Sequence, residues 1–146
     1  MKKYSRTFTA FSTLILFASC FSFYFCKENE ETTPNETLAL LSSGTWHIVN
    51  VTVDGVNRND LFTGFTLTFS PEAYTSTGGE PIWTPSGTWA FVNSTTSTIT
   101  RDDGIVVTIT SLTDTNLKLT LQWDQTTLGG GRIDSIRGEH AFEFNK

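Results

Sequence analysis

Apolar and polar residues alternate with a period of two through most of the C-terminal part of the chain. In 116–123, the clearest case, three leucines and Trp123 alternate with polar residues. This period is typical of an antiparallel strand with one face on a core and the other in water. Applied along the chain, it predicts about eight strands: 45–53, 64–70, 73–77, 87–93, 96–101, 105–111, 116–123 and 138–144.

The connections between these strands differ in length in a regular way. Connections 71–72, 94–95 and 112–115 are short, whereas 54–63, 78–86 and 124–137 are long. Alternate connections of an up-and-down meander lie at opposite ends of the sheet, so one end is tight and the other bears the loops. The pattern therefore predicts an all-β fold, an antiparallel up-and-down eight-stranded β-barrel with a mouth. One or two helical turns are expected just before it, over 36–43, and Gly44 stops them.

The interior of this barrel is predicted to be crowded. Alternation turns seventeen bulky side chains inward: Trp46, Ile48, Phe65, Leu67, Phe69, Trp89, Phe91, Ile99, Ile105, Val107, Ile109, Leu117, Leu119, Leu121, Trp123, Phe142 and Phe144. An eight-stranded barrel is only just wide enough to be filled by its side chains or to hold one small ligand. Both interpretations, a packed interior and a ligand cavity, stay open at this point.

The chain begins with the pattern of an export signal. Three basic residues precede the uncharged run 8–25, which is the order that such a signal requires. Residues 17–20, Phe-Ala-Ser-Cys, resemble the lipobox at which bacterial lipoproteins are cut and acylated, so Cys20 is predicted to carry the lipid. Cys26 is the alternative, because an acidic run follows it directly, although a bulky phenylalanine precedes it. A third interpretation takes the 18-residue uncharged run as a transmembrane signal anchor.

The expected organisation is a signal and lipidation region over 1–26, a flexible linker over 27–37 and one folded domain over 38–146. The linker has no large apolar residue before its end and is rich in Glu, Asn and Thr, a composition that does not fold. Multiple acyl chains would hold the protein at a membrane of the cell envelope, predicted to be the outer membrane, on its periplasmic or surface face. Loss of three basic residues with the signal leaves seven against 15 acidic ones, near −8, which argues against nucleic acid as a partner.

Gly44-Thr45-Trp46 opens the first strand directly after the expected helical turn. This resembles the Gly-x-Trp motif with which lipocalins begin their barrel, and Gly87-Thr88-Trp89 at the fourth strand supports the likeness. The span 38–146 as a whole is similar to the lipocalin-like domains of lipoproteins in Gram-negative bacteria.

This resemblance implies a barrel closed at the Trp46 end, with any ligand entering at the loop-bearing end. It also implies that a basic side chain from the end of the last strand crosses the ring of Trp46. Lys146 stands at that end, whereas Arg137 begins the strand and is expected at the mouth.

Two features supply candidate ligand contacts. The connection 78–86 holds Ile82 and Trp83 between two prolines, which predicts an aromatic presented at the mouth to an apolar or sugar ligand; alternatively, Trp83 folds down over the core. His140 is the one ionisable residue that alternation places inward, and a ligand contact or a pH-sensing role is one interpretation. The other is a rim histidine, half solvated or hydrogen-bonded to a loop carbonyl.

No residue pattern indicates catalysis, a metal or a cofactor. There is no nucleophile elbow and no acid–base pair of carboxylates, and Asp102, Asp103 and Asp124 lack the spacing of a calcium loop. The predicted function is that of a membrane-anchored, non-enzymatic lipocalin-like lipoprotein that binds a small hydrophobic ligand at the barrel mouth. The alternative is a filled barrel that contacts a protein or glycan and takes no small ligand. The pattern indicates no particular oligomeric state.

Overall fold

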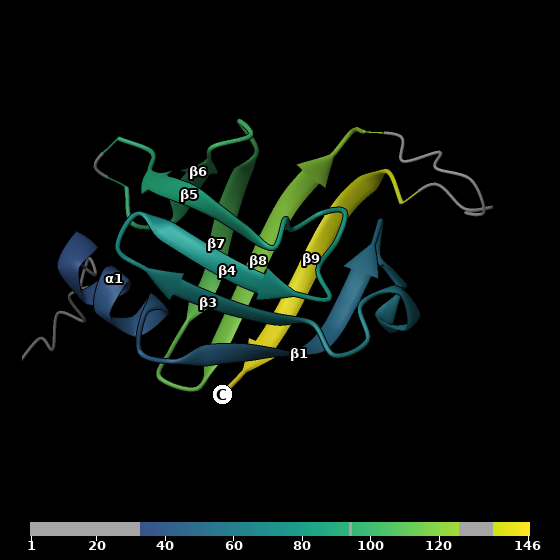
Figure 1. Ribbon diagram of the computed structural model, residues 1–146, viewed down its shortest axis with the longest axis horizontal. Coiled ribbons are helices and arrows are strands. Elements are labelled where there is room, and N and C mark those ends of the chain that lie inside the picture. The colour runs from purple at the N-terminus through teal and green to yellow at the C-terminus, as the bar shows by residue number, and fades with distance from the viewer. Residues whose placement is uncertain (1–32, 94, 126–135) are drawn as a thin grey trace, which may run out of the picture. The chain divides into compact units, whose positions relative to one another are not determined.

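The computed structural model describes residues 33–93, 95–125 and 136–146, and these form one α-helix, one 3-10 turn and nine strands (Figure 1). The elements are α1 (Pro34–Leu41), β1 (Thr45–Val53), β2 (Val56–Asn57), η1 (Asn59–Leu61), β3 (Thr66–Ser70), β4 (Ala73–Thr77), β5 (Ser86–Phe91), β6 (Thr98–Arg101), β7 (Val106–Leu112), β8 (Asn116–Trp123) and β9 (Gly138–Asn145). The predicted signal region, with Cys20 and Cys26, lies outside the described residues.

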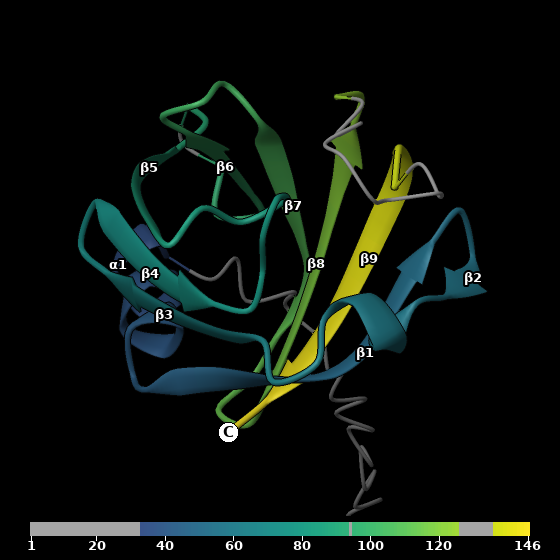
Figure 2. The ribbon, with the colours of Figure 1, turned by 45° about the vertical axis from the view of Figure 1, so that its right-hand side comes forward.

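The strands form a single closed antiparallel barrel. Their order is β2-β1-β3-β4-β5-β6-β7-β8-β9, and the additional pairing of β1 with β9 closes the ring. Figure 2 shows the strands curving round into a barrel, with β9 beside β1. Because the two-residue strand β2 pairs with β1 alone, eight strands make up the wall. The predicted up-and-down eight-stranded barrel is therefore confirmed.

The helix starts earlier than predicted, at Pro34 rather than residue 36, and it also ends two residues earlier. Its N-terminus is fixed by a capping box, in which the Glu36 carboxylate accepts from the Thr33 amide at 2.9 Å while the Thr33 hydroxyl accepts from the Glu36 amide at 3.4 Å. Pro34 stands at the first helical position, where a backbone amide would have no partner within the helix. Because proline has no amide hydrogen, no hydrogen bond is lost there. Helix α1 thus begins inside the segment 27–37 that the sequence assigned to a linker, and Thr37 is buried.

A β-bulge in β1 changes which residues face the core. The register with β9 shifts between Ile48 and Asn50, so Val49 is exposed and Val51 and Val53 are buried. A bulge adds one residue to a strand and reverses its alternation from that point. Ile48, which precedes the shift and pairs with the buried Phe144, packs against the core as predicted but is only half-buried.

The core otherwise follows the predicted alternation. Of the seventeen residues expected inward, all are buried except Ile48, Phe91 and Ile105, which are half-buried. Phe91 is the last residue of β5, and Ile105 precedes β7, so both lie where pairing ends. The sequence did not predict the aromatic side chains that loops and strand β4 add to this core, namely Phe62 and Tyr74.

Candidate functional site

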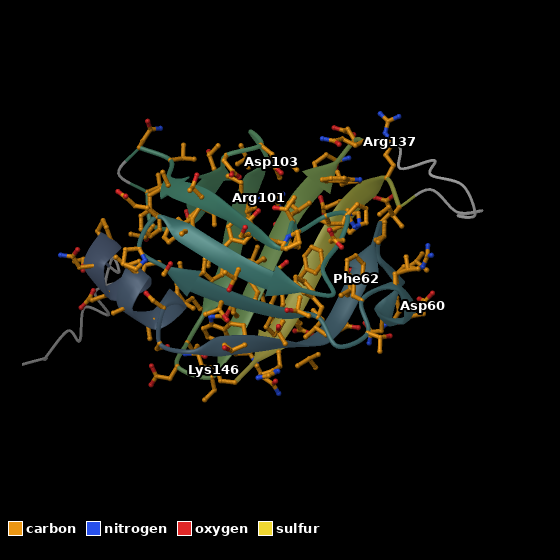
Figure 3. The ribbon with its side chains drawn as sticks, in the orientation of Figure 1. Asp60, Phe62, Arg101, Asp103, Arg137 and Lys146 are labelled. Carbon is orange, nitrogen blue, oxygen red and sulfur yellow. The ribbon has the colours of Figure 1, made fainter. Side chains whose placement is uncertain are left out.

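The two ends of the barrel are built differently. At one end lie Trp46 and the C-terminus, with α1 next to β3; we call this the closed end. At the other end lie Val53, Trp123 and Gly138, which strand pairing brings together; we call this the mouth. Figure 3 shows Lys146 and Arg137 at opposite ends, as predicted.

Every polar group that the motif places at the closed end is paired. The Trp46 indole nitrogen donates to the Leu41 carbonyl at 2.9 Å, and the Lys146 ammonium lies 4.0 Å from the centre of the Trp46 ring. The same ammonium donates to the Leu40 carbonyl at 3.4 Å. The basic side chain that crosses the motif tryptophan is therefore Lys146, as the resemblance implied. The cation–π contact joins the last strand to the first, so this end stabilises the closed barrel.

A second closed-end tryptophan is paired in the same way. Trp89 Nε1 donates to the carbonyls of Ser70 and Ala73 at 3.1 and 2.9 Å. Gly87, two residues earlier, has no room for a side chain, since a Cβ there would lie 2.6 Å from the Tyr74 hydroxyl. Gly87 and Trp89 thus fix strands to one another and line no opening at the mouth.

The loop between β4 and β5 enters the barrel. Ile82 and Trp83 have no exposed surface, and the Trp83 ring meets Phe69, Tyr74 and Phe142 edge-on at 6.4, 5.3 and 6.4 Å between ring centres. Of the two predicted arrangements, the structure has the one in which Trp83 packs on the core. We call Ile82 and Trp83 the plug.

Gly79 allows the plug to enter. A Cβ at this position would lie 2.5 Å from the Phe65 ring and 2.8 Å from Trp83 Cβ, so only glycine fits. The Trp83 amide donates to the Gly79 carbonyl at 2.9 Å, and the Ser76 hydroxyl donates to the Trp83 carbonyl at 3.3 Å. The loop is therefore held by backbone hydrogen bonds as well as by ring packing.

A buried arginine that the sequence analysis missed holds the plug from the other side. Arg101 ends β6 and is fully buried at its side chain, where Nη1 donates to the Ile82 carbonyl at 2.7 Å and Nη2 forms an ion pair with Asp103. Its guanidinium lies 4.7 Å from the Trp83 ring centre and 5.6 Å from that of Tyr74. Figure 3 shows Arg101 beside Asp103. Strand alternation could have identified it, because Arg101 shares its face with the inward-pointing Ile99.

His140 lies deeper than the rim position predicted for it. Its side chain is fully buried, stacks on Phe142 at 5.8 Å and meets Phe62 edge-on at 6.2 Å. His140 Nδ1 lies 3.1 Å from the Gly138 carbonyl oxygen, so the expected carbonyl partner exists but half-solvation was wrong. Burial holds the pKa of His140 below the ordinary histidine value of 6.5, against smaller opposing effects from the Gly138 carbonyl and Asp54.

The tautomer of His140 follows from that hydrogen bond. A carbonyl oxygen only accepts, so Nδ1 carries the hydrogen and Nε2 of the neutral ring is an acceptor. Trp123 is the diagonal neighbour of His140, because Leu121 pairs with His140 and Trp123 with Gly138. Side chains in this relation lie about 7–8 Å apart at their backbones and reach each other when they are aromatic. Glycine opposite Trp123 leaves space for its indole ring.

Four buried side-chain nitrogens have no hydrogen-bond partner in the described part of the chain. They are Trp83 Nε1, Arg101 Nε, Trp123 Nε1 and His140 Nε2. All four belong to the plug or to inward-facing residues of strands β6, β8 and β9. The site thus combines aromatic walls with three unused donors and, on neutral His140, one unused acceptor.

The described residues contain neither a cluster of metal-ligand side chains nor a long apolar helix. They contain no group of three His, Cys, Asp or Glu side chains that could hold a metal ion. Asp103 is paired with Arg101, and Asp124 lies 3.5 Å from Arg137 Nε. Within the same residues, no helix has the length and apolar character to cross a bilayer.

The closed eight-stranded meander, its Gly-x-Trp opening and the basic residue over the tryptophan define a barrel of the lipocalin class. A family model of the lipocalin-like domain matches residues 43–119, which is more than half of the 146-residue chain. The chain belongs to the lipocalin-like domain family. The match covers the first strand and most of the wall up to β8. No curated protein matches the chain.

Proposed function

We propose that this chain is a small-ligand-binding protein whose apolar ligand enters at the mouth and contacts Trp83, Ile82 and His140. Lipocalin-like barrels are in general binding folds, which supports a role in binding rather than catalysis. The observation that carries the proposal is the set of four unpaired buried nitrogens inside the barrel. The indoles of Trp46 and Trp89 in the same barrel are both paired, so the unpaired groups are confined to Trp83, Arg101, Trp123 and His140.

Buried polar groups without a hydrogen-bond partner lower the stability of the folded chain. About 90% or more of buried polar groups in folded proteins have a hydrogen-bond partner. Each one left unpaired costs about 1–3 kcal/mol. A binding site of this kind, aromatic with a few convergent polar atoms, is typical of small-molecule pockets. A ligand that brought complementary atoms would remove the cost, which favours a ligand at the mouth over a purely structural core.

The test uses bromooctane, a neutral alkyl probe that quenches tryptophan only on close contact. The proposal predicts saturable quenching in the wild type, carried by Trp83 and Trp123. Trp123→Phe should therefore remove part of the quenching, whereas Trp89→Phe, at the closed end, should remove none. An unquenched wild type, or quenching that disappears only with Trp89, would contradict the proposal.

A second function is favoured by the plug itself. Because Ile82 and Trp83 are fully buried, the chain's own loop occupies interior space that a ligand would otherwise take. In this alternative, the chain's own side chains fill the barrel, and the protein contacts a protein or glycan through its surface. Trp83→Ala then creates a cavity that bromooctane enters, while the wild type takes up none. That pair of results would select the filled barrel over the ligand binder.

Membrane attachment is part of the same proposal. We infer from the lipobox-like residues 17–20 that Cys20 is acylated, with Cys26 as the alternative, and that the protein is held at the outer membrane. Cys20→Ser should release the protein into the soluble fraction of lysed cells, and Cys26→Ser should not. Release only by Cys26→Ser would move the anchor to that residue. Retention of both single variants and of the double variant would rule out lipidation.

A further inference from the structure

Strand β5 extends past its neighbour β4 at the closed end of the barrel. The ladder between the two strands ends at the pair Ala73 and Thr88, whereas β5 continues to Phe91. The Trp89 amide still donates to the Glu72 carbonyl at 3.0 Å. Beyond that bond, this edge of β5 pairs with no strand among the described residues. The last residues of β5 therefore have an open edge on the side away from β6.

The backbone of Phe91 points into this open edge. On the other side of β5, the Val92 amide donates to the Thr98 carbonyl at 2.9 Å. The Thr88 carbonyl, on that same side, accepts from the Asp102 amide at 3.0 Å. Backbone groups of successive residues in an antiparallel strand point to opposite sides, so Phe91 directs its amide and carbonyl away from β6.

A groove of about 310 Å³ runs along the open edge, and we call it the edge groove. Figure 1 shows α1, the turn between β3 and β4 and the end of β5 together at one end of the barrel. These three segments line the groove, α1 with Pro34 and Leu38, the turn with Pro71, and β5 with Ala90 and Phe91. Because Leu38 and Phe91 are only half-buried and the other three are exposed, the groove offers an apolar surface beside an unpaired strand.

The exposed charges at the groove are acidic. Glu72 lines it, and Asp102 lines an adjoining hollow of about 500 Å³ that shares Glu72 and Ala90 with the groove. Both carboxylates belong to exposed residues. Arg101 also lines the hollow, but its side chain has no exposed surface and forms an ion pair with Asp103. A partner at this surface therefore meets uncompensated negative charge.

We propose that the edge groove binds an extended, basic peptide segment of a partner protein, which adds to β5 as a further strand. The backbone of such a segment supplies the hydrogen-bond partners that the Phe91 amide and carbonyl lack, as in other cases of strand addition. Alternate side chains of an extended segment point to opposite faces. One set enters the apolar groove, while lysines or arginines of the other set reach Glu72 and Asp102.

This inference goes beyond the proposed ligand-binding function and does not depend on it. The edge groove lies on the outside of the barrel, between α1 and β5. A small apolar ligand would contact the walls of the groove but would leave the Phe91 backbone and both carboxylates unmatched. An extended basic segment matches all three features.

The test selects peptides from a phage-displayed random library on the purified protein and measures their affinity by fluorescence polarisation. Selected peptides should be rich in Lys, Arg and β-branched residues. N-methylation of the backbone amides on one edge of a selected peptide removes the donors to β5 and should weaken binding at least about tenfold. Methylation of the alternate amides, which face solvent in the complex, is the matched control and should have little effect.

Two changes in the protein locate the site. Ala90→Trp fills the groove at an exposed position and should weaken the selected peptides at least about tenfold. Val106→Trp is its matched control, because it places the same ring at an exposed position of β7 that does not line the groove. It should leave the affinity unchanged.

The second change removes the negative charge without adding bulk. Glu72→Gln combined with Asp102→Asn should weaken the basic peptides about three- to tenfold. Asp114→Asn, at an exposed carboxylate in the turn between β7 and β8, is its control and should have no effect.

Three results would overturn the inference: no peptide is enriched, the selected peptides bind Ala90→Trp as tightly as the wild type, or the two methylation patterns weaken binding equally. Sedimentation equilibrium adds a fourth, a dimer that Ala90→Trp dissociates, which would assign the groove to a second copy of this chain. Bromooctane quenching reports on the mouth and is measured in the same variants. Its presence or absence therefore decides the proposed function separately from the peptide results.

Discussion

The closed end and the mouth of this barrel contain the same residue types in opposite states. Trp46 and Trp89 donate their indole hydrogens to backbone carbonyls, whereas Trp83 and Trp123 are buried without a partner in the described chain. Burial is nearly complete for all four. The difference therefore lies in hydrogen bonding alone and separates a region built for stability from one with unused binding capacity.

The basic residues show the same contrast. At the closed end, Lys146 lies over the Trp46 ring and donates to a carbonyl at the end of α1. At the plug, Arg101 lies over the Trp83 ring, but one of its guanidinium nitrogens stays unpaired. The polar groups of one barrel can thus be hydrogen-bonded in one region and lack partners in another. A rigid scaffold can carry a binding site in this way.

The largest expected effect tests the closed end. Trp46→Ala removes a fully buried ring, its hydrogen bond to Leu41 and the contact with Lys146, and should lower the free energy of unfolding by about 3–5 kcal/mol. Trp46→Phe, which removes mainly the hydrogen bond, should cost about 1–2 kcal/mol. Urea denaturation measures both. Equal and small losses would show that this end does not hold the fold.

Arg101→Met should come next in size, at about 2–3 kcal/mol, because it leaves the Ile82 carbonyl and Asp103 without their partner. The control is Arg58→Met. Arg58 is half-buried and lies 3.7 Å from the exposed Asp60, so the ion pair is largely solvated and its loss should change stability by less than about 1 kcal/mol. Similar losses in the two variants would contradict the role given to Arg101.

A pair of tryptophan substitutions sharpens the comparison directly. Trp89→Phe removes the indole donor from the Ser70 and Ala73 carbonyls, and it should cost about 1–2 kcal/mol. Trp123→Phe removes an N–H that already lacks a partner, so it should be close to neutral or slightly stabilising. Chemical denaturation without ligand gives both values. A loss for Trp123→Phe as large as that for Trp89→Phe would mean that its indole is paired in solution.

The smallest effect concerns pH. The pKa of His140 is lowered in the folded chain, so the unfolded chain takes up this proton first as the pH falls below the ordinary value of 6.5. Folding stability should therefore decrease from neutral pH downward in this window, and His140→Phe should flatten the decrease. The Glu36 carboxyl, whose pKa is lowered by its bonds to Thr33, loses its contribution only below about 4.5. Thermal midpoints between about pH 5.5 and 7.5 check the difference.

Much of the barrel could be predicted because its strands follow local rules. In β8, every second residue from Leu117 to Trp123 is buried, as alternation predicts. The lengths of the loops distinguished the two ends of the barrel. The bulge at Val49 could not be predicted, because a single extra residue leaves no mark on composition and shows only in the pairing of β1 with β9.

The site was less predictable because it depends on contacts between distant segments. Ile82, Trp83 and His140 were identified from the sequence, but whether Trp83 reaches out or folds in is decided by Gly79 and Arg101, which no local pattern connects to it. Arg101 was missed since an arginine is rarely expected to be buried without its partner in view. Its partners, the Ile82 carbonyl and Asp103, become visible only in the fold.

The most direct test follows the indole N–H signals of the chain's four tryptophans by two-dimensional NMR during titration with octanoic acid. We predict that the Trp123 signal shifts strongly as its N–H gains an acceptor, that the Trp83 signal shifts with it, and that the Trp46 and Trp89 signals do not shift. Four unchanged signals, or shifts confined to Trp46 and Trp89, would contradict the claim that the mouth is the binding end.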